Sequence, residues 1–196
     1  PTGGIMEQAY LVAKYLPKTQ FKQYSIGYCH FDGAFVKKFE DVGVECLHSD
    51  RDYSNLKEII DSKNIHIVHT QTGGGDCEPY ISQLKEWNIP VVHWLHCPRT
   101  CAIPLDSVHT VLYTTPYTLK QNSGEIQTKM QSIQYALDDA PIIEKVHTEK
   151  SPIIVGRLGR IVSDKRPDVI TSLAMMCYIA FGNAIEFHVA GMIPQD

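Results

Sequence analysis

The chain has 196 residues and a formal charge of −4, with 18 Lys and Arg residues against 22 Asp and Glu residues. This mildly acidic chain has no basic run, so nothing in its charge suggests a nucleic-acid partner. Hydrophobic residues make up 43% of the chain, and no apolar stretch approaches the ~20 residues of a membrane span. No signal peptide opens the sequence, and its six scattered cysteines fit reduced thiols better than disulfides, so we expect a cytoplasmic protein.

Hydrophobic spacing in the first third of the chain predicts alternating helices and strands. The expected elements are a helix over 5–16, a strand over 21–28, a helix around 35–42, a strand over 44–48 and a helix around 56–60. The opening Gly3-Gly4 pair lies where a strand-to-helix turn belongs, but no strand precedes it. We therefore expect a first strand upstream of residue 1.

The same alternation continues through the middle of the chain. It predicts a strand over 65–71, a glycine-rich turn over 72–76, a helix over 77–87, strands over 90–96 and 110–115, a short helix after Pro116 and a short strand over 132–136. Strands that alternate with helices through brief connections are typical of parallel βαβ units. The sequence thus predicts an α/β fold with a doubly wound parallel sheet.

A polar break divides this first part from a second one. Residues 138–151 contain no hydrophobic pattern, and proline occurs at 141 and 152. After the break, a strand over 152–158, a helix over 166–181 and a strand over 186–191 are expected. We predict a Rossmann-like domain over 1–140, a linker over 141–151, and the first βαβ unit of a second Rossmann-like domain over 152–196.

Four segments resemble the family-four retaining glycosyltransferases, which have the GT-B fold of two Rossmann-like domains. They are the Gly3-Gly4 turn with its helix, IHIVHTQTGGGD followed by IPVVHWLHC, TVLYTTPYTLKQ followed by IQYALDD, and VGRLGRIVSDKRPDVITSLAMM followed by FHVAG. The resemblance implies transfer of a sugar, with retention, from a nucleoside diphosphate donor to a carbohydrate or lipid-linked acceptor. The first domain would carry the acceptor side and the second domain the donor side.

The chain departs from the family pattern at three places. His69-Thr70-Gln71 stands where the family often has His-x-His, and Tyr135-Ala136 stands where it often has Asn-Gly. The family's later acidic motif, which holds the donor sugar and ribose, does not occur in these residues. We therefore expect activity from a longer parent protein and none from the 196 residues alone.

Phosphate binding is expected at two loops. Gly3 and Gly4 open a helix, where backbone N–H groups and the helix dipole favour an anion, although a plain tight turn would need the same residues. Arg160 and Lys165 lie on a loop that enters another helix, and two cations there suit a diphosphate leaving group without a metal. A solvated loop is the alternative, and Arg157 is a rival for the arginine role.

Sugar and nucleotide contacts are expected at the carboxyl ends of strands, where open α/β sheets bind ligands. His96 ends an apolar strand, and the resemblance places it beside the donor sugar as a hydrogen-bonding group. A histidine buried in the core is the alternative, and His93, on the opposite face by strand parity, is expected to be structural. Gly191 ends the last expected strand, and the resemblance implies that it meets the nucleotide, although a strand-ending glycine needs no ligand. The resemblance also implies that the glycine-rich turn over 72–76 shapes the acceptor site; a flexible connection is the alternative.

A metal site is not expected. His93, His96, Cys97 and Cys101 form a compact group, but the two histidines point to opposite faces and the cysteine spacing is not that of a zinc knuckle.

Two other functions fit the same fold. A GT-B-fold sugar-nucleotide epimerase would need extra carboxylates as acid and base, and none stands out. A non-catalytic Rossmann-like module would bind a partner without turnover. Peripheral membrane contact would fit a lipid-linked acceptor, but no basic amphipathic helix supports it.

Overall fold

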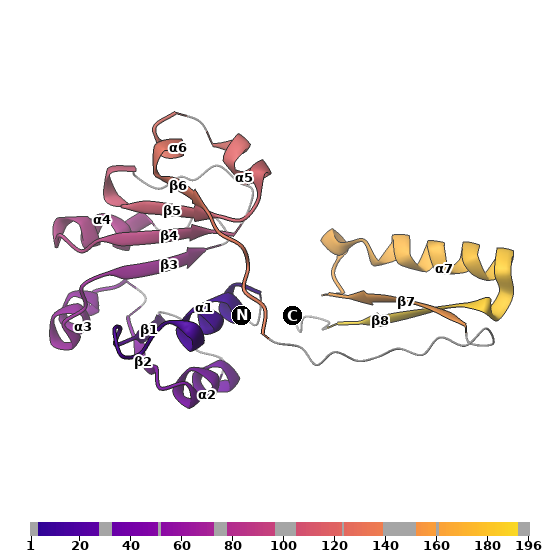
Figure 1. Cartoon of the computed structure of the whole chain (residues 1–196), viewed down its shortest axis with the longest axis horizontal. Helices are drawn as coiled ribbons and strands as arrows, with labels where there is room; N and C mark the ends of the chain where they lie inside the picture. The colour runs from indigo at the N-terminus through magenta and orange to yellow at the C-terminus, as the bar shows by residue number, and fades with distance from the viewer. Residues whose placement is uncertain are drawn as a thin grey trace. The chain divides into compact units, whose positions relative to one another are not determined.

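The computed structural model describes residues 4–27, 33–50, 52–72, 78–96, 105–122, 124–138, 152–159 and 161–191. The chain forms two compact units, Pro1–Asp139 and Ala140–Asp196. Figure 1 shows the elements of both. No helix in the described part of the chain is both long enough and apolar enough to cross a membrane.

The first unit alternates helices and strands along the chain. Its elements are α1 (Gly4–Tyr15), β1 (Tyr24–Gly27), α2 (Gly33–Asp41), β2 (Glu45–His48), α3 (Leu56–Lys63), β3 (Val68–Thr72), α4 (Glu78–Glu86), β4 (Val91–Leu95), a 3₁₀ turn η1 (Leu105–Ser107), β5 (Thr110–Tyr113), α5 (Pro116–Gln121), α6 (Ile126–Lys129) and β6 (Met130–Ser132). The expected helices and strands up to β5 are all present, with ends that differ from the predicted ones by at most three residues.

All strand pairs in this unit are parallel. The main sheet has the order β3-β4-β5-β6, in which Thr72 lies opposite Leu95, and Leu95 lies opposite Tyr113. The strands β1 and β2 form a separate parallel pair. The fold is therefore α/β with a four-stranded parallel sheet, compatible with a Rossmann-like arrangement. The expected single sheet is instead divided, because β1 and β3 do not pair within the described residues.

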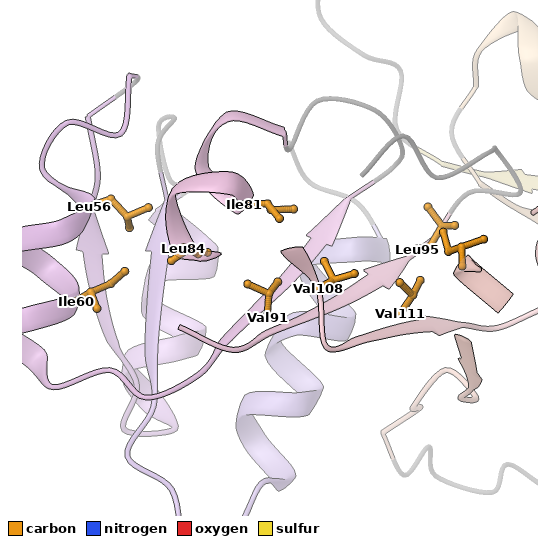
Figure 2. Packing of buried hydrophobic residues seen from close by; sticks show 9 residues of the cluster. Leu56, Ile60, Ile81, Leu84, Val91, Leu95, Val108 and Val111 are labelled. Carbon is orange, nitrogen blue, oxygen red and sulfur yellow. The ribbon is translucent and has the colours of Figure 1, made fainter. Parts of the chain in front are cut away.

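The main core lies against one face of this sheet (Figure 2). It consists of apolar side chains from β4 and β5 together with those of α3, α4 and α6, and of Val108 before β5: Leu56, Ile60, Ile81, Leu84, Val91, Leu95, Val108, Val111 and Ile126. Alternation along β4 directs Val91, His93 and Leu95 to this face. The residues of opposite parity, Trp94 and His96, are therefore directed to the other face.

A second, smaller core lies between α1, α2 and β2. It contains Ala13, Phe35, Phe39 and Val44, with Tyr10 packed edge-on against Phe39. This packing fixes α1 beside the sheet, where it also lies against β3. The buried residues of α1 are Gln8, Leu11 and Ala13, and its first residue, Gly4, is exposed.

The short strand expected over 132–136 is wrong in position. β6 ends at Ser132. Ile133 adds one further backbone hydrogen bond to the Tyr113 carbonyl of β5, and residues 134–138 belong to no strand. The reason lies at Ala136, whose backbone N–H and C=O groups both bond to the side chain of Gln8 on α1 and not to a neighbouring strand. We call residues 133–138 the strap.

The second unit is a single βαβ motif, with β7 (Ile153–Leu158), a 3₁₀ turn η2 (Ser163–Lys165), α7 (Pro167–Phe181), a 3₁₀ turn η3 (Gly182–Ala184) and β8 (Ile185–Ala190). β7 and β8 pair in parallel, as the pattern predicts. The helix α7 carries apolar side chains on all its sides, yet none of its described side chains is buried, and Met176 is 67% exposed. A helix that is apolar on all sides is typical of a larger core than this unit supplies.

Candidate functional site

The candidate site lies where β3 and β4 end. Because the two strands are parallel and in register, their carboxyl ends meet at one edge of the sheet. Gln71 is near the end of β3, and His96 follows β4 directly. This edge is where open α/β sheets bind ligands, and His96 lies there as the residue after β4.

Both ring nitrogens of His96 lie within hydrogen-bonding distance of polar partners. Nε2 is 3.1 Å from Oε1 of Gln71, and Nδ1 is 3.2 Å from the hydroxyl of Tyr135 on the strap. A carboxamide oxygen only accepts hydrogen bonds, so this contact is a hydrogen bond in the tautomer whose Nε2 carries the proton. In a neutral ring Nδ1 is then the acceptor, and the Tyr135 hydroxyl donates to it.

Burial keeps His96 neutral. Its pKa is lowered from 6.5 to about 4, chiefly because burial penalises the imidazolium and secondarily because His69 is nearby. The ring is therefore uncharged at neutral pH, and in that state one nitrogen donates a hydrogen bond and the other accepts one. A neutral histidine of this kind fits hydrogen bonding to a ligand, and its low pKa makes it a weak general base.

Aromatic rings stack around His96. Its ring is 4.7 Å from that of Trp94 and 5.6 Å from that of Tyr135, with only 3° between the His96 and Tyr135 planes. His69 lies on the Trp94 ring as well, at 6.1 Å. Trp94 is 1% exposed whereas Tyr135 is 45% exposed, so the stack runs from the protein interior to the surface.

Three side chains of α1 hold the strap that carries Tyr135. The carboxamide of buried Gln8 bonds to both the N–H and the C=O of Ala136, each at 2.9 Å. Lys14 forms an ion pair with Asp138 at 2.7 Å, and the Tyr15 hydroxyl also donates to Asp138. This link raises the pKa of Lys14 and lowers that of Asp138. The residue after Tyr135 is thus fixed to the helix that begins at Gly4.

The expected phosphate residues of the first unit lie at the start of this helix. Gly4 is the first residue of α1 and is exposed, and a Cβ there would meet no atom within 4 Å, so packing does not require glycine. Gly3 lies outside the described residues. The two hydrogen bonds from Gln8 hold α1 against the strap. Gly4 is about one helix turn before Gln8, and the strap carries Tyr135 of the His96 site.

The expected donor residues lie in the second unit. Lys165 ends the turn η2 and is exposed, and Gly191 follows β8 and is also exposed. The rival Arg157 donates from Nη2 to the carbonyl of Lys165, so it closes the loop between β7 and η2. Arg160 lies outside the described residues, as does the glycine-rich turn from residue 73 onward.

His93 and His96, the histidines of the group considered for zinc, are directed to opposite faces of the sheet. His93 is buried and lies 2.7 Å from the hydroxyl of Thr70 on the core-facing side of the sheet, whereas His96 joins the aromatic stack on the other side. Within the residues that the structure describes, no group of three or more His, Cys, Asp or Glu side chains could hold a metal ion. Cys97 and Cys101 lie outside those residues.

Gln71, Trp94, Tyr135 and Gln8 were not predicted as site residues. Strand parity would have found Trp94, which is two residues before His96 and shares its face. Gln71 and Tyr135 occupy the two positions where the first part of the chain departs from the glycosyltransferase pattern, and the structure brings both onto His96. Gln8 carries no local pattern, because its partner is 128 positions away in the chain.

Two shallow hollows lie at the opposite edge, near the amino ends of the strands. One is lined by Lys18, Phe21, Lys22, Gln23, Gly43 and Val44. The other is lined by Lys85, Asn88, Ile89, Pro90, Asp106, Ser107 and His109.

Comparisons with known proteins identify no relative: no protein-family model, no curated protein and no solved structure matches the chain.

Proposed function

We propose that the chain is part of a retaining glycosyltransferase of the GT-B type, which moves a sugar from a nucleoside diphosphate to an acceptor hydroxyl. The first unit supplies the acceptor side and a contact to the donor sugar, and the second unit supplies donor phosphate contacts. The acceptor is a carbohydrate or a lipid-linked sugar.

One observation carries this proposal: His96 is held neutral at the carboxyl end of a parallel sheet, in a stack of aromatic rings with an exposed rim. Aromatic faces suit the apolar faces of sugar rings, and a neutral imidazole suits their hydroxyl groups. The residues that carry the sequence resemblance lie on the same elements, since β3, β4 and the strap all come from those segments.

The proposed chemistry at the donor is electrostatic. Negative charge grows on the leaving diphosphate as the bond to the sugar lengthens, and a fixed cation stabilises that charge. Lys165 and Arg160 of the second unit are proposed for this role. Gly4, exposed at the start of α1 in the first unit, is proposed separately as a phosphate contact through backbone N–H groups. His96 contacts the sugar and does not remove its proton.

The proposal is tested by equilibrium binding to the whole 196-residue chain. The probes are UDP-glucose, GDP-mannose and ADP-glucose, measured by ligand-observed NMR and by isothermal titration calorimetry. We expect at least one probe to bind, and His96→Ala to weaken its binding about tenfold or more, since a lost buried hydrogen bond and stacking contact are worth about 1.5 kcal/mol or more.

His66→Ala is the matched control, because His66 is exposed just before β3 at the opposite edge of the sheet. It should bind the probe as the wild type does. If no nucleotide sugar binds, or if His96→Ala and His66→Ala are equivalent to the wild type, the proposed function is wrong. If a longer protein that contains this chain binds a nucleotide sugar but transfers no sugar, the alternative of a non-catalytic binding module is favoured.

A further inference from the structure

The two hydrogen bonds to His96 have different exposures, and this difference decides which nitrogen a ligand can reach. The Gln71 contact to Nε2 is partly buried, whereas the Tyr135 contact to Nδ1 is at the surface, and the tyrosine side belongs to the strap. The Nε2 proton is therefore committed to the protein. The nitrogen that can exchange partners is Nδ1.

We propose that Gln71 and Tyr135 are positioning residues that fix His96 as the Nε2–H tautomer, so that Nδ1 accepts a hydrogen bond from a sugar hydroxyl that replaces the Tyr135 hydroxyl. The sugar in this statement rests on the proposed function; the tautomer does not. An acceptor Nδ1 also excludes some ligand groups. Ionised phosphodiester and carboxylate oxygens have no proton to donate, so they cannot replace the Tyr135 hydroxyl at this nitrogen.

The aromatic stack explains why a ligand hydroxyl can displace the Tyr135 hydroxyl while the His96 ring keeps its position. The rings of His96 and Tyr135 are nearly parallel, with centroids 5.6 Å apart, and Trp94 stacks against both. The His96 ring therefore keeps a wall of aromatic contacts when the Tyr135 hydroxyl moves. Gln8 holds the neighbouring Ala136 at both backbone groups, which limits how far the strap can move.

The first part of the experiment uses the protein without a ligand. Histidine side-chain ¹⁵N spectra are recorded from pH 4 to 8 for the wild type, Gln71→Leu, Gln71→Glu and Tyr135→Phe. Among the described residues, the titratable groups around His96 are His69 on β3, His93 on β4 and Tyr135 on the strap. His69 and His93 are assigned in the same spectra and serve as internal references.

We expect the wild-type His96 to show the Nε2–H tautomer throughout the range above pH 5. Gln71→Leu should add the Nδ1–H tautomer, because the acceptor for the Nε2 proton is lost. Gln71→Glu should restore the Nε2–H form, since a carboxylate also accepts, and should raise the pKa of His96 by about 1 or more. Tyr135→Phe should move the Nδ1 resonance to that of an unbonded nitrogen while the ring stack remains.

Tyr117→Phe is the control, because Tyr117 is an exposed tyrosine on α5. It should leave the His96 resonances unchanged. The positioning role is wrong if the wild-type His96 is mainly the Nδ1–H tautomer, or if neither Gln71→Leu nor Tyr135→Phe changes its resonances. Circular dichroism of each variant separates these results from unfolding.

The second part adds a ligand to Tyr135→Phe. The nucleotide sugar that binds should return the Nδ1 resonance to its hydrogen-bonded value, because a sugar hydroxyl supplies the missing donor. Dimethyl phosphate, a diester that is fully ionised at neutral pH and has no proton to donate, should not do so. If a nucleotide sugar binds and Nδ1 stays unbonded, the hydroxyl assignment is wrong while the proposed function survives. If no nucleotide sugar binds, the proposed function fails together with the hydroxyl assignment, and the ligand-free spectra still decide the positioning role.

Discussion

His93 and His96 are three positions apart, yet their surroundings give them different roles. His93 is buried on the core-facing side of the sheet and bonds to Thr70, whereas His96 is half-buried at the strand end and bonds to side chains that reach solvent. Burial lowers the pKa of each to about 4. One histidine therefore belongs to the core, and the other forms the site.

The pKa of His93 predicts how stability depends on pH. Its value falls from 6.5 in the unfolded chain to about 4 in the folded one, first because of burial and then because of His69 and His96. Between these values the unfolded chain binds more protons, so the free energy of unfolding falls as the pH drops from about 6.5 to 4. Above pH 6.5 the contribution of neutral His93 to stability is complete. For a buried group this loss amounts to up to about 3 kcal/mol.

His93→Gln should reduce this loss, because glutamine can keep a hydrogen bond to Thr70 but does not titrate. The measurement is urea unfolding at pH 7.5 and 4.5, followed by the fluorescence of Trp87 and Trp94, both in the first unit. His66→Gln, at an exposed position, should keep the wild-type difference between the two pH values. An unchanged difference in His93→Gln would show that another group causes the acid sensitivity.

At the scale of elements, the strap is bonded to β5 at Ile133, and beyond that residue side chains of α1 hold it. Gln8 is 7% exposed and supplies both hydrogen bonds to Ala136, in the manner of a neighbouring strand. Gln8→Met keeps similar length and removes both bonds. We expect it to lower the stability of the first unit by about 1–2 kcal/mol.

Hydrogen exchange gives the local measure of the same change. The Ala136 amide should exchange at least about tenfold faster in Gln8→Met, while the amides of β4 keep their order of protection, because local opening needs less free energy than global unfolding. Gln20→Met, at an exposed turn, should change stability by less than about 0.5 kcal/mol. An Ala136 amide without protection in the wild type would show that the clamp does not form in solution.

The elements that the sequence predicts and those it does not differ in the range of their contacts. β4 and α3 are predicted because their apolar spacing shows in the local sequence. The strap is not, since Ala136 is bonded to a residue 128 positions away. The same holds for the site: the place of His96 follows from strand polarity, but its partners Gln71 and Tyr135 lie 25 and 39 positions from it.

At the scale of the whole molecule, the two units differ in how completely they are packed. The first unit has two buried clusters, whereas no described side chain of α7 in the second unit is buried. Exposed apolar residues on β7 and β8 add to this, among them Ile153 and Val189. The well-packed unit carries the His96 site, so a binding measurement on the chain depends mainly on it.

The central claim is that a nucleotide sugar binds at the carboxyl ends of β3 and β4, and amide chemical shifts locate that binding directly. The ¹⁵N-labelled chain is titrated with the nucleotide sugar that binds, and changes are mapped on the first unit. We expect amide chemical-shift changes at residues 70–72, 94–96 and 133–136 and in the first turn of α1, with the largest changes around His96. Changes confined to the hollows around Gly43 or His109 at the opposite edge, or no saturable change at any residue, would contradict it.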